Sequence, residues 1–89
     1  MYRVELTPRA QHELNKLGRV EFERIVAAIR ALEGNPHPLG ARKLRGPIYR
    51  IRVGAWRIIY AVFNKDRLVI VGKITRRSED TYNKVDRLF

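Results

Sequence analysis

The spacing of the hydrophobic residues changes near the middle of the 89-residue chain. In residues 8–34 apolar side chains recur every three or four positions, which is the period of a helix with one buried face. In residues 48–75 they alternate with polar side chains or run on continuously, and β-branched and aromatic residues dominate, as they do in strands. The pattern therefore predicts helices in the first half and a sheet in the second.

Two helices are predicted, joined as an antiparallel hairpin. Thr7-Pro8 is typical of an N-cap followed by proline at the first helical position, and Gly18 is placed to end this helix. Its apolar face consists of Ala10, Leu14 and Leu17. Gly34-Asn35-Pro36 ends the second helix. The apolar stripe of that helix consists of Phe22, Ile25, Val26, Ile29 and Leu32.

Four strands and a last helix complete the predicted order β-α-α-β-β-β-α. A short strand is expected at residues 2–6, and residues 35–47, with three prolines and two glycines, are expected to form a loop. An antiparallel meander follows over 48–53, 56–63 and 67–75. A short helix capped by Ser78 is predicted over 78–89, with Tyr82, Val85 and Leu88 on one side. The expected fold is α+β, a helical hairpin packed on an antiparallel sheet in one domain, 1–89.

The turn at Gly54-Ala55 sets the pairing of two arginines. A two-residue turn with glycine first is typical of type II′, and it places Arg52 directly opposite Arg57. Arg50 shares their face because side chains alternate along a strand. Like charges facing each other across a ladder are destabilising, so a sheet selected only for stability would avoid this arrangement. The three arginines therefore indicate a site for an anion.

The loop at residues 64–66 decides whether a fourth arginine joins them. If its length is even, Arg57 lies across from Ile74, and Arg76 follows on the same face. The other face is expected to pack on the helices, and it carries Tyr49, Ile51, Val53, Trp56, Ile58, Tyr60, Val62, Val69 and Val71. The cationic face has an apolar end that needs a cover, from the last helix or a partner protein; this end consists of Ile59, Ala61, Phe63, Leu68 and Ile70.

The charge of the chain lies mainly in this second half. The formal net charge is +10, and residues 42–77 carry eleven Lys and Arg against Asp66 alone. Such an excess predicts a polyanionic partner: nucleic acid, an acidic protein or an anionic membrane. The absence of cysteine excludes disulfides and thiolate nucleophiles and fits a reducing cytosol. No signal peptide or span of about 20 apolar residues is visible, so a soluble, cytoplasmic protein is expected.

Four short segments carry a family resemblance. They are Lys43-Leu44-Arg45-Gly46, Tyr49-Arg50-Ile51-Arg52, Gly54-Ala55-Trp56-Arg57-Ile58-Ile59-Tyr60, and Arg76-Arg77 shortly before Tyr82. Each is weak alone, but at these spacings, and with the element order above, they resemble the RelE/ParE toxin superfamily of type II toxin-antitoxin systems over essentially the whole chain. The likeness is closer to the RelE branch. It implies a ribosome-dependent endoribonuclease that cuts mRNA in the ribosomal A site and so inhibits translation.

The resemblance also implies site residues and partners. Carried over position by position, the catalytic set is Arg50, Arg52, Arg57, Arg76 and Tyr82. Residues expected to contact RNA are Lys43, Arg45, Lys73 and Arg77. The best-known members have lysines where this chain has Arg50 and Arg52, which leaves the general base open. The implied partners are a cognate RelB-like antitoxin, with which a heterotetramer could form, and a ribosome with bound mRNA; no membrane, metal or cofactor is implied.

Metal-free cleavage of RNA by the neighbouring 2′-OH needs a base, an acid and cations to stabilise the phosphorane. The sequence is rich only in cations, because His12 and His37 lie outside the basic segment. Arginine, with a pKa above about 12, is a poor base. Lys43, Lys73 and Tyr82 are therefore the candidates for proton transfer.

Other functions and simpler roles stay open beside this one. The chain could instead be a ParE-like toxin that poisons DNA gyrase by binding, or a non-catalytic RNA-binding relative. The arginines could bind phosphate without catalysis, and Lys43 could be a solvated loop residue. Trp56 and Tyr60 are expected to belong to the core rather than to stack on bases. Tyr82 could pack beside its apolar neighbours on the last predicted helix.

Overall fold

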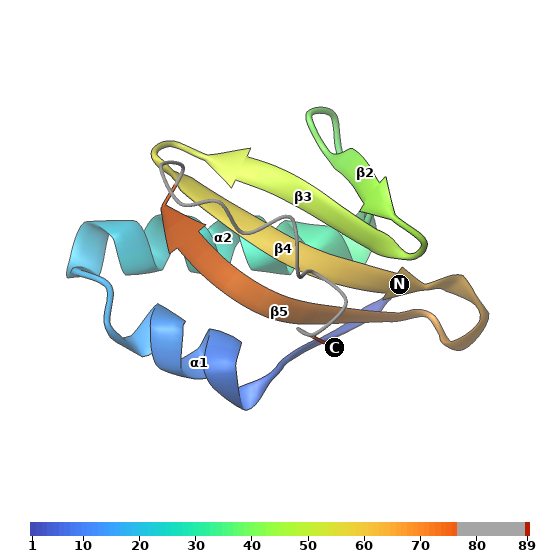
Figure 1. The fold of residues 1–89 in the computed structure, drawn as a ribbon, viewed down its shortest axis with the longest axis horizontal. Helices are drawn as coiled ribbons and strands as arrows, with labels where there is room; N and C mark the ends of the chain where they lie inside the picture. Colours follow the sequence, from blue (N-terminus) through green and yellow to red (C-terminus); the bar gives the residue numbers. More distant parts are fainter. Residues whose placement is uncertain (77–88) are drawn as a thin grey trace.

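A five-stranded sheet organises residues 1–76 and 89, the part of the chain that the computed structural model describes (Figure 1). The strands lie in the order β1-β5-β4-β3-β2. Their bounds are β1 Arg3–Leu6, β2 Arg42–Arg45, β3 Ile48–Val53, β4 Trp56–Phe63 and β5 Leu68–Arg76. Two helices, α1 (Pro8–Asn15) and α2 (Arg19–Gly34), precede β2, and a short 3₁₀ turn, Asn64–Asp66, joins β4 to β5. The α+β class is confirmed.

The sheet is mixed rather than purely antiparallel. The neighbours β2-β3, β3-β4 and β4-β5 run antiparallel, as the meander predicted. The first strand, however, pairs in parallel with the last, with Val4 beside Val69 and Leu6 beside Val71. This pairing brings the N-terminal segment next to residues more than sixty positions later, and the helical hairpin lies in the connection between them.

The starts and ends of the helices follow local chemistry, with one correction. Thr7 is the N-cap of α1, and its hydroxyl accepts a hydrogen bond from the Ala10 N–H at 3.1 Å, with Pro8 in the first turn. Gly18, expected to end α1, is instead the N-cap of α2, with an ordinary φ of −63°. The helix α1 already ends at Asn15, so the hairpin connection is built from residues before the glycine.

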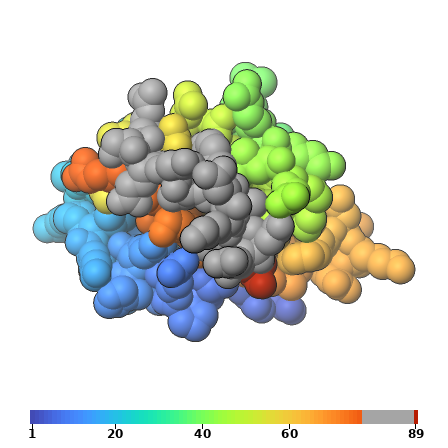
Figure 2. Space-filling view, viewed as in Figure 1, coloured from blue at the N-terminus to red at the C-terminus, as the bar shows by residue number. Residues whose placement is uncertain are grey.

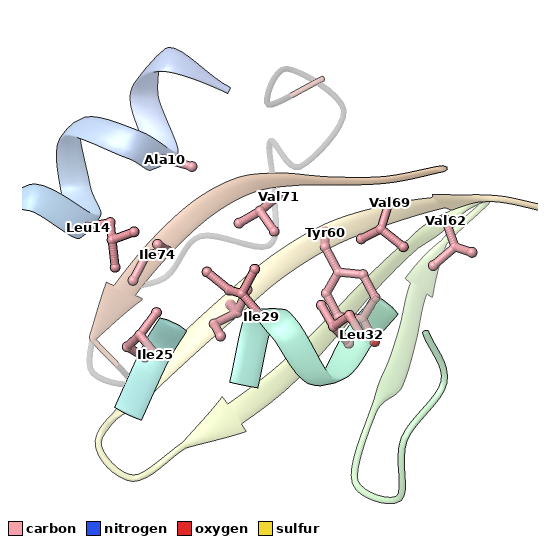
Figure 3. Packing of buried hydrophobic residues seen from close by; sticks show 11 residues of the cluster. Ala10, Leu14, Ile25, Ile29, Leu32, Tyr60, Val62, Val69, Val71 and Ile74 are labelled. Carbon is pink, nitrogen blue, oxygen red and sulfur yellow. The ribbon is translucent and has the colours of Figure 1, made fainter. Parts of the chain in front are cut away.

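The helices bury their apolar stripes on one face of the sheet (Figure 3). The core formed there consists of Ala10, Leu14, Ile25, Ile29, Leu32, Ile58, Tyr60, Val62, Val69, Val71 and Ile74. The remaining apolar residues predicted for this sheet face, Trp56 among them, are partly buried and pack against this core. Phe22, expected in the stripe of α2, is 37% exposed, because it precedes the part of the helix that is buried on the sheet.

The hydroxyl of Tyr60 has a hydrogen-bond partner inside this core. The ring is fully buried, and the hydroxyl donates a hydrogen bond to the Pro36 carbonyl at 2.8 Å. Burial, together with the neighbouring Tyr49, raises the pKa of Tyr60 to about 12. The side chain therefore acts in packing, as the sequence predicted, and it fastens the loop after α2 to the sheet.

The segment predicted as a loop over residues 35–47 contains the edge strand β2. Arg42 pairs with Arg50, and Lys43 pairs with Tyr49 on β3. The prediction was wrong because these four residues, Arg42–Arg45, show almost no apolar alternation and stand between prolines. The free backbone edge of β3 supplies the hydrogen-bonding partners that form the strand.

Two further points concern the ends of the molecule. The helix predicted over residues 78–89, with its Ser78 cap and Tyr82, lies outside the described residues, apart from Phe89. Among the residues that are described, neither helix is long and apolar enough to cross a membrane.

Candidate functional site

Three arginines share the sheet face that points away from the helical core. The turn after β3 has Gly54 at φ +59°, the positive φ that a type II′ turn requires at its first central position. This turn pairs Val53 with Trp56 and Arg52 with Arg57. The predicted register is thus confirmed, and Arg50, opposite Ile59, lies on the same face as the arginine pair.

These arginines differ in their exposure to solvent. Arg50 is buried, with 6% of its surface exposed, whereas Arg57 is half-buried and Arg52 is exposed. Burying a guanidinium and opposing two of them across a ladder both cost free energy. Proteins tolerate such costs mainly where a function requires them. The face is therefore suited to an anion, for which these guanidiniums can act as multidentate donors.

Arg76 does not lie on this face, contrary to the sequence prediction. The connection from Phe63 to Leu68 is even, the condition under which the sequence places Arg76 on this face, but Tyr60 pairs with Val71 while Ile59 pairs with Lys73. Gly72 is the extra residue of a β-bulge, which shifts the rest of β5 by one position. The glycine inside a strand pattern was the available sign of this bulge.

The bulge changes the cross-strand partners of Arg57 and Arg76. Thr75, not Ile74, pairs with Arg57, and Ile74 turns into the helical core. Arg76 pairs with Trp56, and its guanidinium carbon lies 4.9 Å from the centre of a Trp56 ring. This stacking is a cation–π contact. Opposite Arg57 the cationic face thus carries buried Thr75, and Arg76 lies on the other face.

Lys73, one candidate for a general base or an RNA contact, is tied to α1. Its ammonium lies 3.2 Å from Glu13 Oε2, and the other oxygen of that carboxylate accepts a hydrogen bond from the Ile74 N–H at 2.8 Å. Both side chains of the ion pair are largely buried. The arrangement stabilises β5 just after the bulge and engages the ammonium in a structural contact.

The basic residues of β2 divide between the two faces. Lys43 pairs with Tyr49 and so lies on the opposite side from Arg50. Arg45 pairs with Ile48 after a register shift, and Leu44 packs on a second apolar cluster at the other end of the cationic face. That cluster contains buried Ile48, Ile59 and Ala61, with Leu44 and Phe63 against it, and includes part of the apolar end that was expected to need a cover.

Sequence reasoning missed Arg42. It pairs directly with Arg50 across β2 and β3, whereas the sequence predicts a loop at this position, and a loop has no strand register. In Figure 2 the green segment around β2 lies toward the upper right of the molecule. A pocket of about 520 Å³ lies here, and its lining includes Arg42, Arg50 and Arg52 together with residues 39–41.

The other chemistry-bearing residues lie elsewhere. His37 contacts the ring of Tyr49, with centroids 4.7 Å apart, and His12 is exposed on α1, so neither accompanies the arginines. Within residues 1–76 and 89 no three His, Asp or Glu side chains gather as metal ligands would. Tyr82 and Arg77 lie outside the described residues, so their place relative to the arginines stays a prediction.

Comparison with known proteins adds independent information. Residues 4–81 match the family model of the ParE toxin of the type II toxin-antitoxin system parDE. A curated Methanocaldococcus jannaschii protein, described as a candidate toxin RelE1, is 32% identical over 81 residues, covering 85% of this chain and 90% of that protein.

Solved structures resemble the whole described fold. A chain in the archaeal RelE-RelB complex from Pyrococcus horikoshii superposes with a TM-score of 0.81 at 29% identity, over 89% of this chain and 98% of that one. A chain in the intact E. coli RelBE toxin-antitoxin complex gives 0.75 at 25% identity, over 89% and 100%. The isolated E. coli RelE toxin, at 23% identity and a TM-score of 0.77 over the full length of both chains, shares the fold.

Proposed function

The chain belongs to the ParE toxin family of type II toxin-antitoxin systems and is RelE-like, and from this premise we propose that it is a ribosome-dependent mRNA endoribonuclease. The observation that carries the proposal is the cross-strand pair Arg52–Arg57 beside buried Arg50. A toxin that acts only by binding a protein has no need of costly guanidiniums on one sheet face. A phosphodiester that gains charge during cleavage does need them.

The reaction assigned to this face is attack of a ribose 2′-OH on the adjacent phosphate. The hydroxyl loses its proton, its oxygen bonds to phosphorus, and the 5′-oxygen leaves with a proton, which yields a cyclic phosphate and a free 5′-OH. Arg50, Arg52 and Arg57 stabilise the additional charge of the phosphorane, and no metal takes part. Arginine cannot act as the base at neutral pH, and Lys73 is paired with Glu13. Lys43 lies on the opposite face of the sheet, so the proposal assigns proton transfer to Tyr82.

A site with abundant cations and no strong base depends on positioning. The ribosome would supply it by holding the mRNA in the A site with the scissile phosphate against the arginines. Dependence on the ribosome thus follows from the composition of this face, and the place of action is the cytoplasm, where translating ribosomes occur.

The partner proposed for control is an acidic, RelB-like antitoxin. The solved relatives from Pyrococcus horikoshii and E. coli are RelE-RelB and toxin-antitoxin complexes. Opposite charge favours the same partner, since this chain carries +10. Co-purification of an untagged acidic neighbour, and the mass of the complex, would test both the partner and the proposed heterotetramer.

The decisive experiment compares three proteins on ribosomes programmed with a defined mRNA. Wild type is expected to cut in the A site, and Arg57→Ala is expected to lower the rate at least about 100-fold, because one preorganised donor to the phosphorane is removed. Arg9→Ala removes the same charge from an exposed position on α1 and is expected to cut normally. Uncut mRNA with wild type, and equal toxicity of wild type and Arg57→Ala, would refute the proposal.

Inhibition of DNA gyrase is the second candidate, because the matching family model is named for ParE. A supercoiling assay with purified gyrase distinguishes the two functions. Loss of supercoiling at toxin concentrations that leave ribosome-bound mRNA intact would favour gyrase as the target.

A further inference from the structure

Arg42 extends the cationic face to a third strand. It pairs in register with Arg50, which places its side chain on the same face as Arg50 and Arg52. Two cross-strand arginine pairs therefore stand on neighbouring strands, Arg42 with Arg50 and Arg52 with Arg57. Each pair opposes like charges across a ladder, and the destabilisation is incurred twice within a few residues.

No acidic residue lies near these pairs in the sequence. Between Glu33 and Asp66 the chain has no Asp or Glu at all, so β2, β3 and β4 contribute only positive charge. An anion bound from outside would offset the repulsion within both pairs. The repulsion and the anion site are thus two consequences of the same arrangement.

The pocket beside Arg42 has the features of a binding site. It holds about 520 Å³ and is lined by residues 39–42 and 50–52, among them Arg42, Arg50 and Arg52. Arg50, one of the lining residues, is more than nine-tenths buried. At the rim, the side chain of Leu39 is fully exposed and offers an apolar surface for a base.

We propose that this pocket binds a backbone phosphate of single-stranded RNA, next to the phosphate held between Arg52 and Arg57. Arg42 supplies the donor specific to the pocket, and Arg50 lies between the two phosphate positions. The identity of the anion as RNA rests on the proposed function, whereas the existence of the site rests on the register, the burial and the volume. Arg42 is thereby a binding residue that positions the strand and does not take part in the chemical step.

The test measures binding without cleavage. The probe is a fluorescent RNA of about ten nucleotides with 2′-O-methyl groups, titrated with the purified chain at several salt concentrations. Arg42→Gln is expected to weaken binding about tenfold, the effect typical of removing one charge-assisted hydrogen bond. The slope of log affinity against log salt should become shallower by about 0.7, the value expected for each phosphate that a protein neutralises on a single strand.

Two further variants keep the result interpretable. Arg9→Gln makes the same change of charge on α1, outside the pocket, and is expected to leave both affinity and slope nearly unchanged. Arg42→Lys keeps the charge but removes the planar fork, so it should restore the slope and only part of the affinity. Equal effects of Arg42→Gln and Arg9→Gln would overturn the proposal, since the +10 would then act only as a general field.

Failure of this site and failure of the nuclease function give different results. If wild type leaves ribosome-bound mRNA uncut while Arg42→Gln still weakens RNA binding more than Arg9→Gln, the RNA-binding pocket is supported and the proposed function is refuted. If wild type cuts mRNA but Arg42→Gln binds RNA as Arg9→Gln does, the function stands and the pocket is refuted.

Discussion

The two faces of the sheet differ in what they contribute: one stabilises the fold, and the other places positive charges close together. The face toward α1 and α2 is apolar, and the buried hydroxyl of Tyr60 on this face donates to the Pro36 carbonyl. The other face carries Arg50, Arg52 and Arg57, placed where their charges repel one another. Burial on the first face provides the free energy that allows the second to remain unfavourable. Stability and function are thereby separated by the alternation of side chains along the same strands.

Substitutions of two neighbouring residues on β4 give the largest expected difference in the free energy of unfolding. Ile58 is fully buried toward the helices, whereas Arg57 lies on the cationic face. Ile58→Ala should lower the free energy of unfolding by about 2–5 kcal/mol, because it removes buried methyl groups and leaves a cavity. Denaturant unfolding measures this decrease. Arg57→Ala should unfold almost as wild type while cleavage falls, and a large decrease of stability in it would break the separation between the faces.

A smaller effect is expected from Tyr60→Phe, which leaves the buried Pro36 carbonyl without its hydroxyl donor. The decrease at neutral pH should be about 1–3 kcal/mol in unfolding free energy. The control is Tyr2→Phe, which removes a hydrogen bond to Asn64 at an exposed position and should cost less.

The unfolding free energy of wild type is expected to depend on alkaline pH more strongly than that of Tyr60→Phe. The pKa of Tyr60 is about 12 in the folded protein against 10.0 for an ordinary tyrosine. The neutral hydroxyl favours the folded state fully below pH 10, and this advantage is lost as the pH rises from about 10 to 12. Wild type should lose about 2–3 kcal/mol more than Tyr60→Phe across this range. Parallel stability curves for the two proteins would contradict the burial of an un-ionised hydroxyl.

The smallest expected effect is a gain. Arg52→Gln removes the repulsion with Arg57 and should raise the unfolding free energy by about 0.2–1 kcal/mol while lowering RNA cleavage. Lys65→Gln, in the turn at the other end of β4, makes the same change of charge and should leave stability unchanged. Equal gains from both variants would mean that net charge, rather than the facing pair, limits stability.

Much of the site could be predicted because its key pairings are local. Gly54 fixed the turn, and the turn determined that Arg52 faces Arg57. Arg76 could not be placed in this way, because a single extra residue, Gly72, reverses the faces of everything after it. Arg42 was missed since its strand exists only through pairing with the edge of β3.

By itself the sequence determined the helical hairpin, the three long strands, the apolar face and the arginine pair at the β3–β4 turn. These features depend on periodicity, caps and turn residues, which act over a few positions. Only the tertiary structure decided the parallel pairing of β1 with β5, the existence of β2 and the side on which Arg76 lies. Their energies come from backbone groups and side chains that are distant in sequence. Gly72 is a local sign of a bulge, but the pairing with β4 decides where the register shifts.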